Sequence, residues 1–181
     1  MLTVAIIGAG ALGRSLALRA ARAGFRVLLE DLLPANLNSA RDSIHKLLGP
    51  EKLSALVFVP AIEDAVREAD LVIDCVPDEL ESKLEILWLI DRMAPPRTVI
   101  ATPTLNLSIT DLASCTYRPG KCIAIAASPA TLQSAVSSAV LLRITPATSQ
   151  ESVALASHFF LRLGFYPAIE PEQAIPIPPR L

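Results

Sequence analysis

A glycine-rich segment near the start of the chain has the residue types and spacing of a phosphate-binding turn. Gly8, Gly10 and Gly13 form the pattern G-x-G-x-x-G in "VAIIGAGALGRSLAL". In such a turn the first glycine permits a tight bend, the second lets a pyrophosphate approach the backbone, and the third lets the next helix pack on the preceding strand. The N–H groups at the start of that helix, at Ala11 and Leu12, would face the pyrophosphate. The segment therefore predicts a nucleotide site.

An acidic residue follows at the distance expected of a ribose contact. Asp31 closes the strand-like segment "FRVLLED" 18 positions after Gly13, where a carboxylate accepts hydrogen bonds from the adenosine ribose. It would also repel a 2′-phosphate, and residues 32–34 contain no arginine to bind one, although Arg14 or Arg26 could turn toward it. NAD is therefore favoured over NADP. The alternative is an inherited turn that packs a helix on a sheet and binds no cofactor.

Strands and helices that alternate along the chain are needed to bring these residues together, and the sequence supplies them. Apolar residues at helical spacing, proline at helix starts and glycine at helix ends predict the boundaries. Strands are expected at residues 4–8, 25–31, 56–60, 70–77, 97–102, 121–128, 139–145 and 165–170. Helices are expected at residues 11–23, 34–49, 61–69, 78–94, 108–113 and 148–164, the last two opened by the capping boxes Ser108-x-x-Asp111 and Thr148-x-x-Glu151. The alternation predicts parallel pairing with crossovers at least through the fifth strand.

The composition supports an α/β fold in one domain. Apolar residues make up 52% of the 181 residues and aromatic residues only 4%, which suits buried parallel strands covered by helices. The expected architecture is a Rossmann-type, doubly wound, mostly parallel sheet with helices on both faces, in three α/β/α layers. We expect this NAD-binding domain to span residues 1–170. Residues 171–181 form a proline-rich C-terminal tail for which no regular structure is expected.

The charge pattern and the cysteines argue against several classes of function. The 16 basic and 18 acidic residues are scattered, without the basic stripe that nucleic acid or an anionic membrane would need. No apolar run approaches the roughly 20 residues of a membrane span, and no positively charged leader precedes the first strand, so a cytoplasmic location is expected. Cys75, Cys115 and Cys122 have no C-x-x-C spacing, which favours reduced thiols over a metal site.

Several segments together resemble the NAD-binding domain of the 3-hydroxyacyl-CoA dehydrogenases of fatty-acid β-oxidation. "DLVIDCVPDELESK" and "NLSITDLA" are more particular to that family than the glycine turn, and the likeness extends from "VAIIGAGALG" to "LRLGFYPAI". The resemblance implies NAD as the cofactor, bound by the glycines and Asp31. It also implies a groove wall at Val76 and Pro77, and a position for Lys83 near the nicotinamide ribose.

The catalytic residues of that family are missing from the corresponding positions. The family's histidine, which takes the proton from the 3-hydroxyl group, falls at about Ala126, and its asparagine falls at about Pro129. The glutamate that orients the histidine falls at Leu141 or, with a three-residue shift, at Ser138. No His, Asp or Glu occurs between Leu112 and Gln150, so a small shift does not restore the pair. A positioned general base contributes roughly 10²- to 10⁴-fold in rate, and its loss predicts no useful hydroxyacyl-CoA oxidation.

Two further departures concern the substrate side. Residues 102–107 read Thr-Pro-Thr-Leu-Asn-Leu where the family has a polar serine-rich loop, so its serines have largely become apolar or moved. "AIPIPPRL" stands where the family continues into its helical dimerisation domain. A face around Leu105, Leu107 and the C-terminal tail is therefore expected to be exposed and apolar, and a homodimer could form through it.

The remaining polar residues of interest favour structural roles. His45 and His158 lie away from the family's catalytic positions, Asp74 and Asp78 fit a groove wall better than acid–base chemistry, and Ser108 fits a helix cap better than a nucleophile.

Three hypotheses for the function of the chain result. The chain is a catalytically inactive NAD(H)-binding relative, an active NAD-dependent oxidoreductase with altered catalytic residues, or a structural module with a closed groove. The intact glycine turn favours the first over the third.

Overall fold

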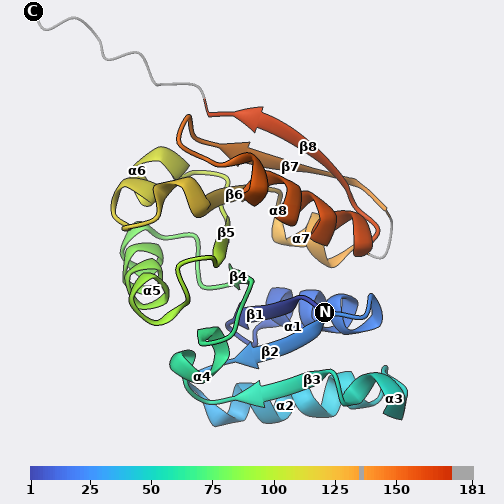
Figure 1. Cartoon of the computed structure of the whole chain (residues 1–181). Helices are drawn as coiled ribbons and strands as arrows, with labels where there is room; N and C mark the ends of the chain where they lie inside the picture. The colour runs from blue at the N-terminus through green and yellow to red at the C-terminus, as the bar shows by residue number, and fades with distance from the viewer. Residues whose placement is uncertain (135–136, 173–181) are drawn as a thin grey trace, which may run out of the picture.

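Eight β-strands form one sheet in the part of the protein that the computed structural model describes, residues 1–134 and 137–172. The order across the sheet is β3-β2-β1-β4-β5-β6-β7-β8 (Figure 1). The strands are β1 (Thr3–Ile7), β2 (Arg26–Glu30), β3 (Leu56–Val59), β4 (Leu71–Asp74), β5 (Val99–Pro103), β6 (Cys122–Ala126), β7 (Ala139–Ile144) and β8 (Tyr166–Pro171). Neighbouring strands are parallel except β6 and β7, which are antiparallel.

Helices cover both faces of this sheet and complete the three expected layers. They are α1 (Ala11–Arg22), α2 (Pro34–His45), α3 (Pro50–Leu53), α4 (Ile62–Val66), α5 (Leu80–Met93), α6 (Ile109–Ser114), α7 (Pro129–Gln133) and α8 (Gln150–Arg162). Apolar side chains of α1, α2 and α8 pack into one core cluster with one face of the sheet. Those of α4, α5 and α6 pack into a second cluster on the other face. The doubly wound α/β prediction is therefore confirmed.

Some local predictions differ from the structure. The last helix begins at Gln150, and its cap is Ser149, whose hydroxyl accepts the N–H of Ser152 at 3.2 Å. Thr148, the expected cap, instead donates its hydroxyl to the carbonyl oxygen of Cys122 at 3.2 Å, because it belongs to the turn after β7. Two short helices, α3 and α7, and a 3₁₀ turn at Pro119–Lys121 were not expected from the sequence.

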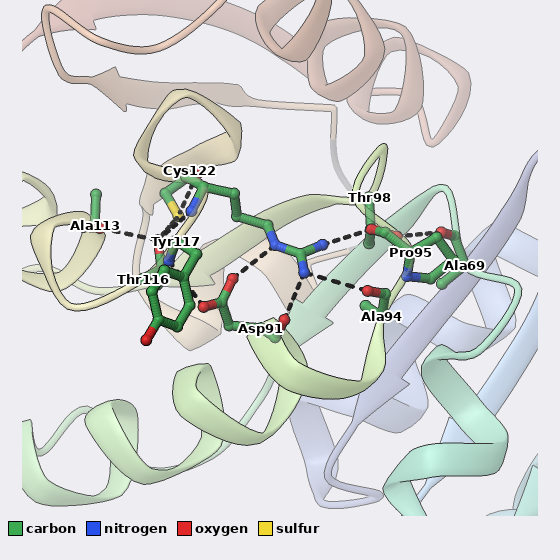
Figure 2. A network of polar contacts seen from close by, with 10 residues as sticks. Ala69, Asp91, Ala94, Pro95, Thr98, Ala113, Thr116, Tyr117 and Cys122 are labelled. Atoms are coloured by element: carbon green, nitrogen blue, oxygen red, sulfur yellow. Dashed lines mark hydrogen bonds and ion pairs between the residues drawn. The ribbon is translucent and has the colours of Figure 1, made fainter.

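An arginine fastens the end of α5 to the segment before β6 (Figure 2). Arg118 donates Nε to Asp91 Oδ1 at 2.7 Å and its terminal nitrogens to the carbonyl oxygens of Asp91, Ala94 and Pro95 at 2.5–3.2 Å. The last carbonyl groups of a helix have no partner within the helix. Arg118 satisfies two of them, at Asp91 and at the cap Ala94, together with the carbonyl of Pro95 that follows, and so ties the end of α5 to the segment before β6.

The described chain ends at Glu172, directly after the last strand. β8 extends to Pro171, so it includes the first residue of the predicted proline-rich tail. The rest of that tail from residue 173 lies outside the described residues.

Candidate functional site

A groove of about 740 Å³ lies at the carboxyl ends of the central strands. It extends from the loop after β2, across the turn between β1 and α1, to the ends of β4, β5 and β6. β1 and β4 are neighbours in the sheet. α1, which follows β1, packs on one face of the sheet, and α5, which follows β4, packs on the other. Open α/β sheets bind their ligands at such a switch point.

The three glycines of the turn meet different structural needs. Gly8 has a φ of +98°, which favours glycine, and donates its N–H to the carbonyl of Glu30 at 2.8 Å. A Cβ atom on Gly13 would lie 1.8 Å from the carbonyl oxygen of Gly8. A Cβ atom on Gly10 would meet nothing within 4 Å, and its φ of −66° suits any residue. The fold thus requires Gly8 and Gly13, whereas nothing in the described structure requires Gly10.

The N-terminus of α1 borders the groove without a side-chain cap. Gly10 occupies the cap position, and the first turn of this twelve-residue helix contains no acidic residue. The first N–H groups of a helix have no acceptors within it and carry partial positive charge. Gly10, Ala11 and Leu12 line the groove, while no Lys, Arg or His side chain does so among the described residues. An anion in this groove would therefore be held by backbone donors.

Asp31 is held in a fixed orientation beside the turn. Its Oδ2 accepts the N–H of Ala9 at 2.8 Å, and its Oδ1 accepts the N–H of Leu33 at 2.9 Å. The side-chain amide of Asn36 donates to both oxygens at 3.0 and 3.1 Å. Asn36 also lines the groove, and it is a site residue that the sequence reasoning missed. The carboxylate thus links the glycine turn to the start of α2.

The two arginines considered for a 2′-phosphate have other positions. Arg26 forms an ion pair with Glu68 at 2.7 Å from the start of β2, whereas Asp31 follows the end of that strand. Arg14 donates to the hydroxyl of Ser39 at 2.9 Å on the surface of α1. Neither lines the groove.

The segment after β4 forms the opposite wall. Cys75, Val76 and Pro77 all line the groove. Val76 and Pro77 are the two residues that the resemblance assigned to its wall. Burial raises the pKa of the Cys75 thiol, so the thiol stays protonated. Asp78 accepts the N–H of Leu105 at 3.1 Å, which ties this wall to the loop after β5.

Lys83, in contrast, is not brought to the groove. Its ammonium group donates to Asp74 Oδ1 at 2.5 Å, and both side chains are 0% exposed. Burial raises the pKa of Asp74, and the charge of Lys83 opposes that rise. In the structure Lys83 is the buried partner of Asp74, under the wall rather than in it.

Glu30 contributes a buried carboxyl group to the groove lining. It ends β2, with Ile7 and Val59 as its neighbours on the adjacent strands, and is 3% exposed. Among the described residues no hydrogen bond or ion pair reaches its side chain. Burial, with a smaller contribution from the charge of Asp31, raises the pKa of Glu30 to about 7. The sequence reasoning singled out only Asp31 of this adjacent acidic pair.

The end of the groove opposite Asp31 is mostly apolar. Ala126 pairs with Leu141 across β6 and β7, so the positions assigned to the family's histidine and glutamate are direct neighbours. The groove is lined here by Leu105, Ala127 and Pro129, with Thr104 and Gln133 as polar side chains. None of these side chains is an acid or a base.

Other candidate groups lie elsewhere. His45 and His158 are exposed and do not line the groove, and each packs edge-on to a phenylalanine ring at 6.2 Å. Ser108 accepts the N–H of Asp111 at 3.1 Å, which confirms it as a helix cap. Within residues 1–134 and 137–172 no cluster of His, Cys, Asp or Glu is arranged to bind a metal ion. No helix of this part of the chain has the length and apolar character to cross a membrane.

The mostly parallel sheet, its switch point and the glycine turn define the class as a dinucleotide-binding Rossmann domain. Residues 3–167 match the family model described as 3-hydroxyacyl-CoA dehydrogenase, NAD binding domain. The chain therefore belongs to the 3-hydroxyacyl-CoA dehydrogenase family as its NAD-binding domain, and NAD is the cofactor of this domain. The resemblance found in the sequence is confirmed.

Individual relatives agree with this assignment. A 3-hydroxybutyryl-CoA dehydrogenase of Bradyrhizobium diazoefficiens is 35% identical over 134 residues, covering 67% of this chain and 46% of the relative. The lambda-crystallin homolog of Homo sapiens is 30% identical over 134 residues, covering 66% of this chain and 42% of the relative. The crystal structure of 3-hydroxybutyryl-CoA dehydrogenase from Escherichia coli has a TM-score of 0.84 at 30% identity, covering 94% of this chain and 38% of that one. This chain thus spans less than half the length of each of these three proteins.

Proposed function

We propose that this chain binds NAD(H) in the groove and does not catalyse the dehydrogenation typical of its family. The observation that carries the first half is Gly10. Its backbone conformation is open to any residue and a Cβ atom there would touch nothing, so the packing of the protein does not explain a glycine. A pyrophosphate that lies against the backbone at this point does explain it.

The pyrophosphate and the adenosine ribose of the cofactor have matching groups in the groove. The N-terminus of α1 would hold the pyrophosphate, and Asp31 would accept hydrogen bonds from the adenosine ribose. Val76 and Pro77 would bound the cofactor on the side of β4. Lys83 has no part in this arrangement, since Asp74 engages it in the core. When bound, NAD supplies a hydride acceptor next to the apolar end of the groove.

The second half of the proposal concerns the proton that must leave the substrate. A hydroxyl group can lose hydride to NAD only if its proton also has an acceptor. At Ala126 and Leu141 the chain offers two hydrocarbon side chains in contact positions. Loss of the base alone lowers the rate by roughly 10²- to 10⁴-fold. An active oxidoreductase would need a base from another chain or from an unusual residue of this one, and this is the alternative.

A titration with NADH tests the binding, followed by energy transfer from Trp88 and by calorimetry, with NADPH as the comparison. We expect micromolar NADH affinity and much weaker NADPH affinity, because Asp31 repels a 2′-phosphate. Gly10→Ala should leave the melting temperature nearly unchanged and weaken NADH binding roughly tenfold or more, since a methyl group in a filled space costs about 1–3 kcal/mol.

Gly13→Ala is the matched control, because its Cβ atom meets backbone in the free protein. It should lower the melting temperature whether or not a ligand is present. No binding of either nucleotide at millimolar concentration would overturn the proposal and leave a structural module. Rapid NADH formation from a 3-hydroxyacyl-CoA would overturn its second half.

Self-association is a further part of the proposal. Leu105 is 51% exposed beside a second groove of about 640 Å³ that Leu107 also lines. A homodimer through this face would cover it. Sedimentation at high protein concentration tests this, and a strict monomer would remove it. A cytoplasmic location would keep Cys75, Cys115 and Cys122, which are all free thiols, in the reduced state.

A further inference from the structure

We infer that Glu30 recognises the adenine base of the nucleotide, through hydrogen bonds from its carboxyl group to the amino-bearing edge of the base. The inference rests on the proposed function, namely that NAD(H) occupies the groove. It adds a specificity-determining residue to the glycine turn and Asp31.

The placement of Glu30 follows from the register of the sheet. Directly paired residues of parallel strands present their side chains to the same face, so Glu30 shares a face with Ile7 of β1 and Val59 of β3. Both neighbours are aliphatic. α4 covers this part of the face, and its first residue, Ile62, lines the groove together with Glu30.

The carboxyl group of Glu30 has no partner among the described residues of the free protein. It is 3% exposed and no donor within the described chain reaches it, but its oxygens are not among the described side-chain atoms closed off from solvent, so water in the groove meets them. A carboxyl group in so enclosed a position loses much of its hydration, which costs stability. An aliphatic residue like its two neighbours would fill the same place without that cost. A polar ligand in the groove would satisfy the group.

The position of Asp31 indicates which part of the ligand lies near Glu30. A carboxylate at the end of the second strand binds the adenosine ribose, so the base must lie beyond it, on the side of β2 and α4. Leu32, Leu33 and Ile62 provide apolar walls there. The amide nitrogen of Asn36 is engaged by Asp31, which leaves Asn36 only an acceptor, so in this half of the described groove Glu30 is the side chain that can both accept from and donate to the base.

The chemistry of adenine matches a protonated carboxyl group. Adenine presents an amino donor next to a ring-nitrogen acceptor. A neutral carboxyl group accepts from the first with its C=O and donates to the second with its O–H. A carboxylate keeps only the first bond and faces the lone pair of the ring nitrogen. Because the pKa of Glu30 is about 7, the protonated form is available near neutral pH.

The charged groups around Glu30 favour the same form. Asp31 follows it in the chain and raises its pKa, and Asp78 lines the same groove. On the same face of the sheet the charge of Asp74 is matched by Lys83. The acidic residues of α4, Glu63 and Asp64, are exposed to solvent. No cation among the described groove residues offsets these negative charges.

The test compares the wild-type chain with the variants Glu30→Gln and Glu30→Val in NADH titrations at pH 6 and pH 8.5. For the wild-type chain, NADH affinity should fall several-fold as the pH rises, because the carboxyl group loses the O–H that donates to the base. Glu30→Gln keeps one donor and one acceptor, so its affinity should be high and independent of pH. Glu30→Val should bind roughly five- to tenfold more weakly at pH 6, the effect of one or two lost hydrogen bonds.

A second ligand makes the contact specific to the base. In 1,N6-etheno-NADH the amino group and the adjacent ring nitrogen are tied into an extra ring. The loss of affinity from NADH to the etheno analogue should be several-fold larger for the wild-type chain than for Glu30→Val. Any steric effect of the extra ring is present in both proteins and cancels in the comparison. NADH could instead bind while all three proteins show the same pH dependence of affinity and the same loss of affinity for the etheno analogue. That result would overturn the inference about Glu30 and leave the proposed function standing. If NADH binds to none of them, the proposed function falls as well.

Discussion

The buried carboxyl group of Glu30 should make the stability of the free protein depend on pH. The folded pKa of about 7 lies above the ordinary value of 4.5, so the folded state holds a proton that the unfolded state has released between these two values. Stability must then fall as the pH rises through this window and level off above it. A difference of about 2.5 at about 1.4 kcal/mol per pH unit amounts to about 3 kcal/mol. This figure is a ceiling, because the groove admits water.

Urea unfolding followed by circular dichroism at intervals from pH 4.5 to pH 8.5 measures this effect, with Glu30→Gln as the control. Gln has the size of Glu but does not titrate, so the effects of all other titrating groups cancel when the unfolding free energies of the two proteins are subtracted. Its stability relative to the unchanged chain should rise by up to about 3 kcal/mol between pH 4.5 and pH 8. Domains of this kind have about 5–15 kcal/mol in total, so the change is large. Parallel curves for the two proteins would refute the reasoning.

Three other outcomes follow from the contacts described above. Lys83→Met leaves the buried carboxyl of Asp74 without its cation. The free energy of unfolding in urea should therefore fall by about 3–5 kcal/mol at pH 8 and by less at pH 5, where Asp74 can protonate. Equal losses at the two pH values would contradict this. Arg118→Ala should cost about 2–4 kcal/mol in thermal unfolding, since it leaves several buried acceptors unsatisfied, and an unchanged melting temperature would refute the role of this arginine. Cys115 is exposed whereas Cys122 is buried, with its pKa raised to about 11, so a disulfide reagent should modify Cys115 first in the native protein and Cys122 only on unfolding, and the reverse order would be inconsistent with the fold.

The parts of the site that the sequence predicted correctly are those with local causes. A strand, a glycine turn and a helix are encoded in consecutive residues, and Gly8 and Gly13 have the geometry that this pattern requires. The order of strands and helices follows from hydrophobic spacing for the same reason. Asp31 was identifiable because it follows the second strand directly.

The parts that could not be predicted depend on register and on contacts between distant segments. Which of the adjacent acids Glu30 and Asp31 turns toward the core depends on the pairing of β2 with its neighbours. The burial of Lys83 depends on how the start of α5 lies over β4, where Asp74 ends the strand. The choice of Ser149 over Thr148 as a cap depends on the turn after β7, which uses Thr148 for itself.

The central place of β1 in the sheet also matters for synthesis on the ribosome. β1 can pair with β2 soon after it emerges, but its other edge waits for β4, since Val4 pairs with Leu71, 67 residues later. At roughly 5–20 residues per second this delay lasts about 3–13 s. During this time a nearly finished glycine turn exists beside an open, aliphatic strand edge, which is a template for aggregation. The nascent chain therefore exposes this strand edge before the second wall of its nucleotide groove has been made.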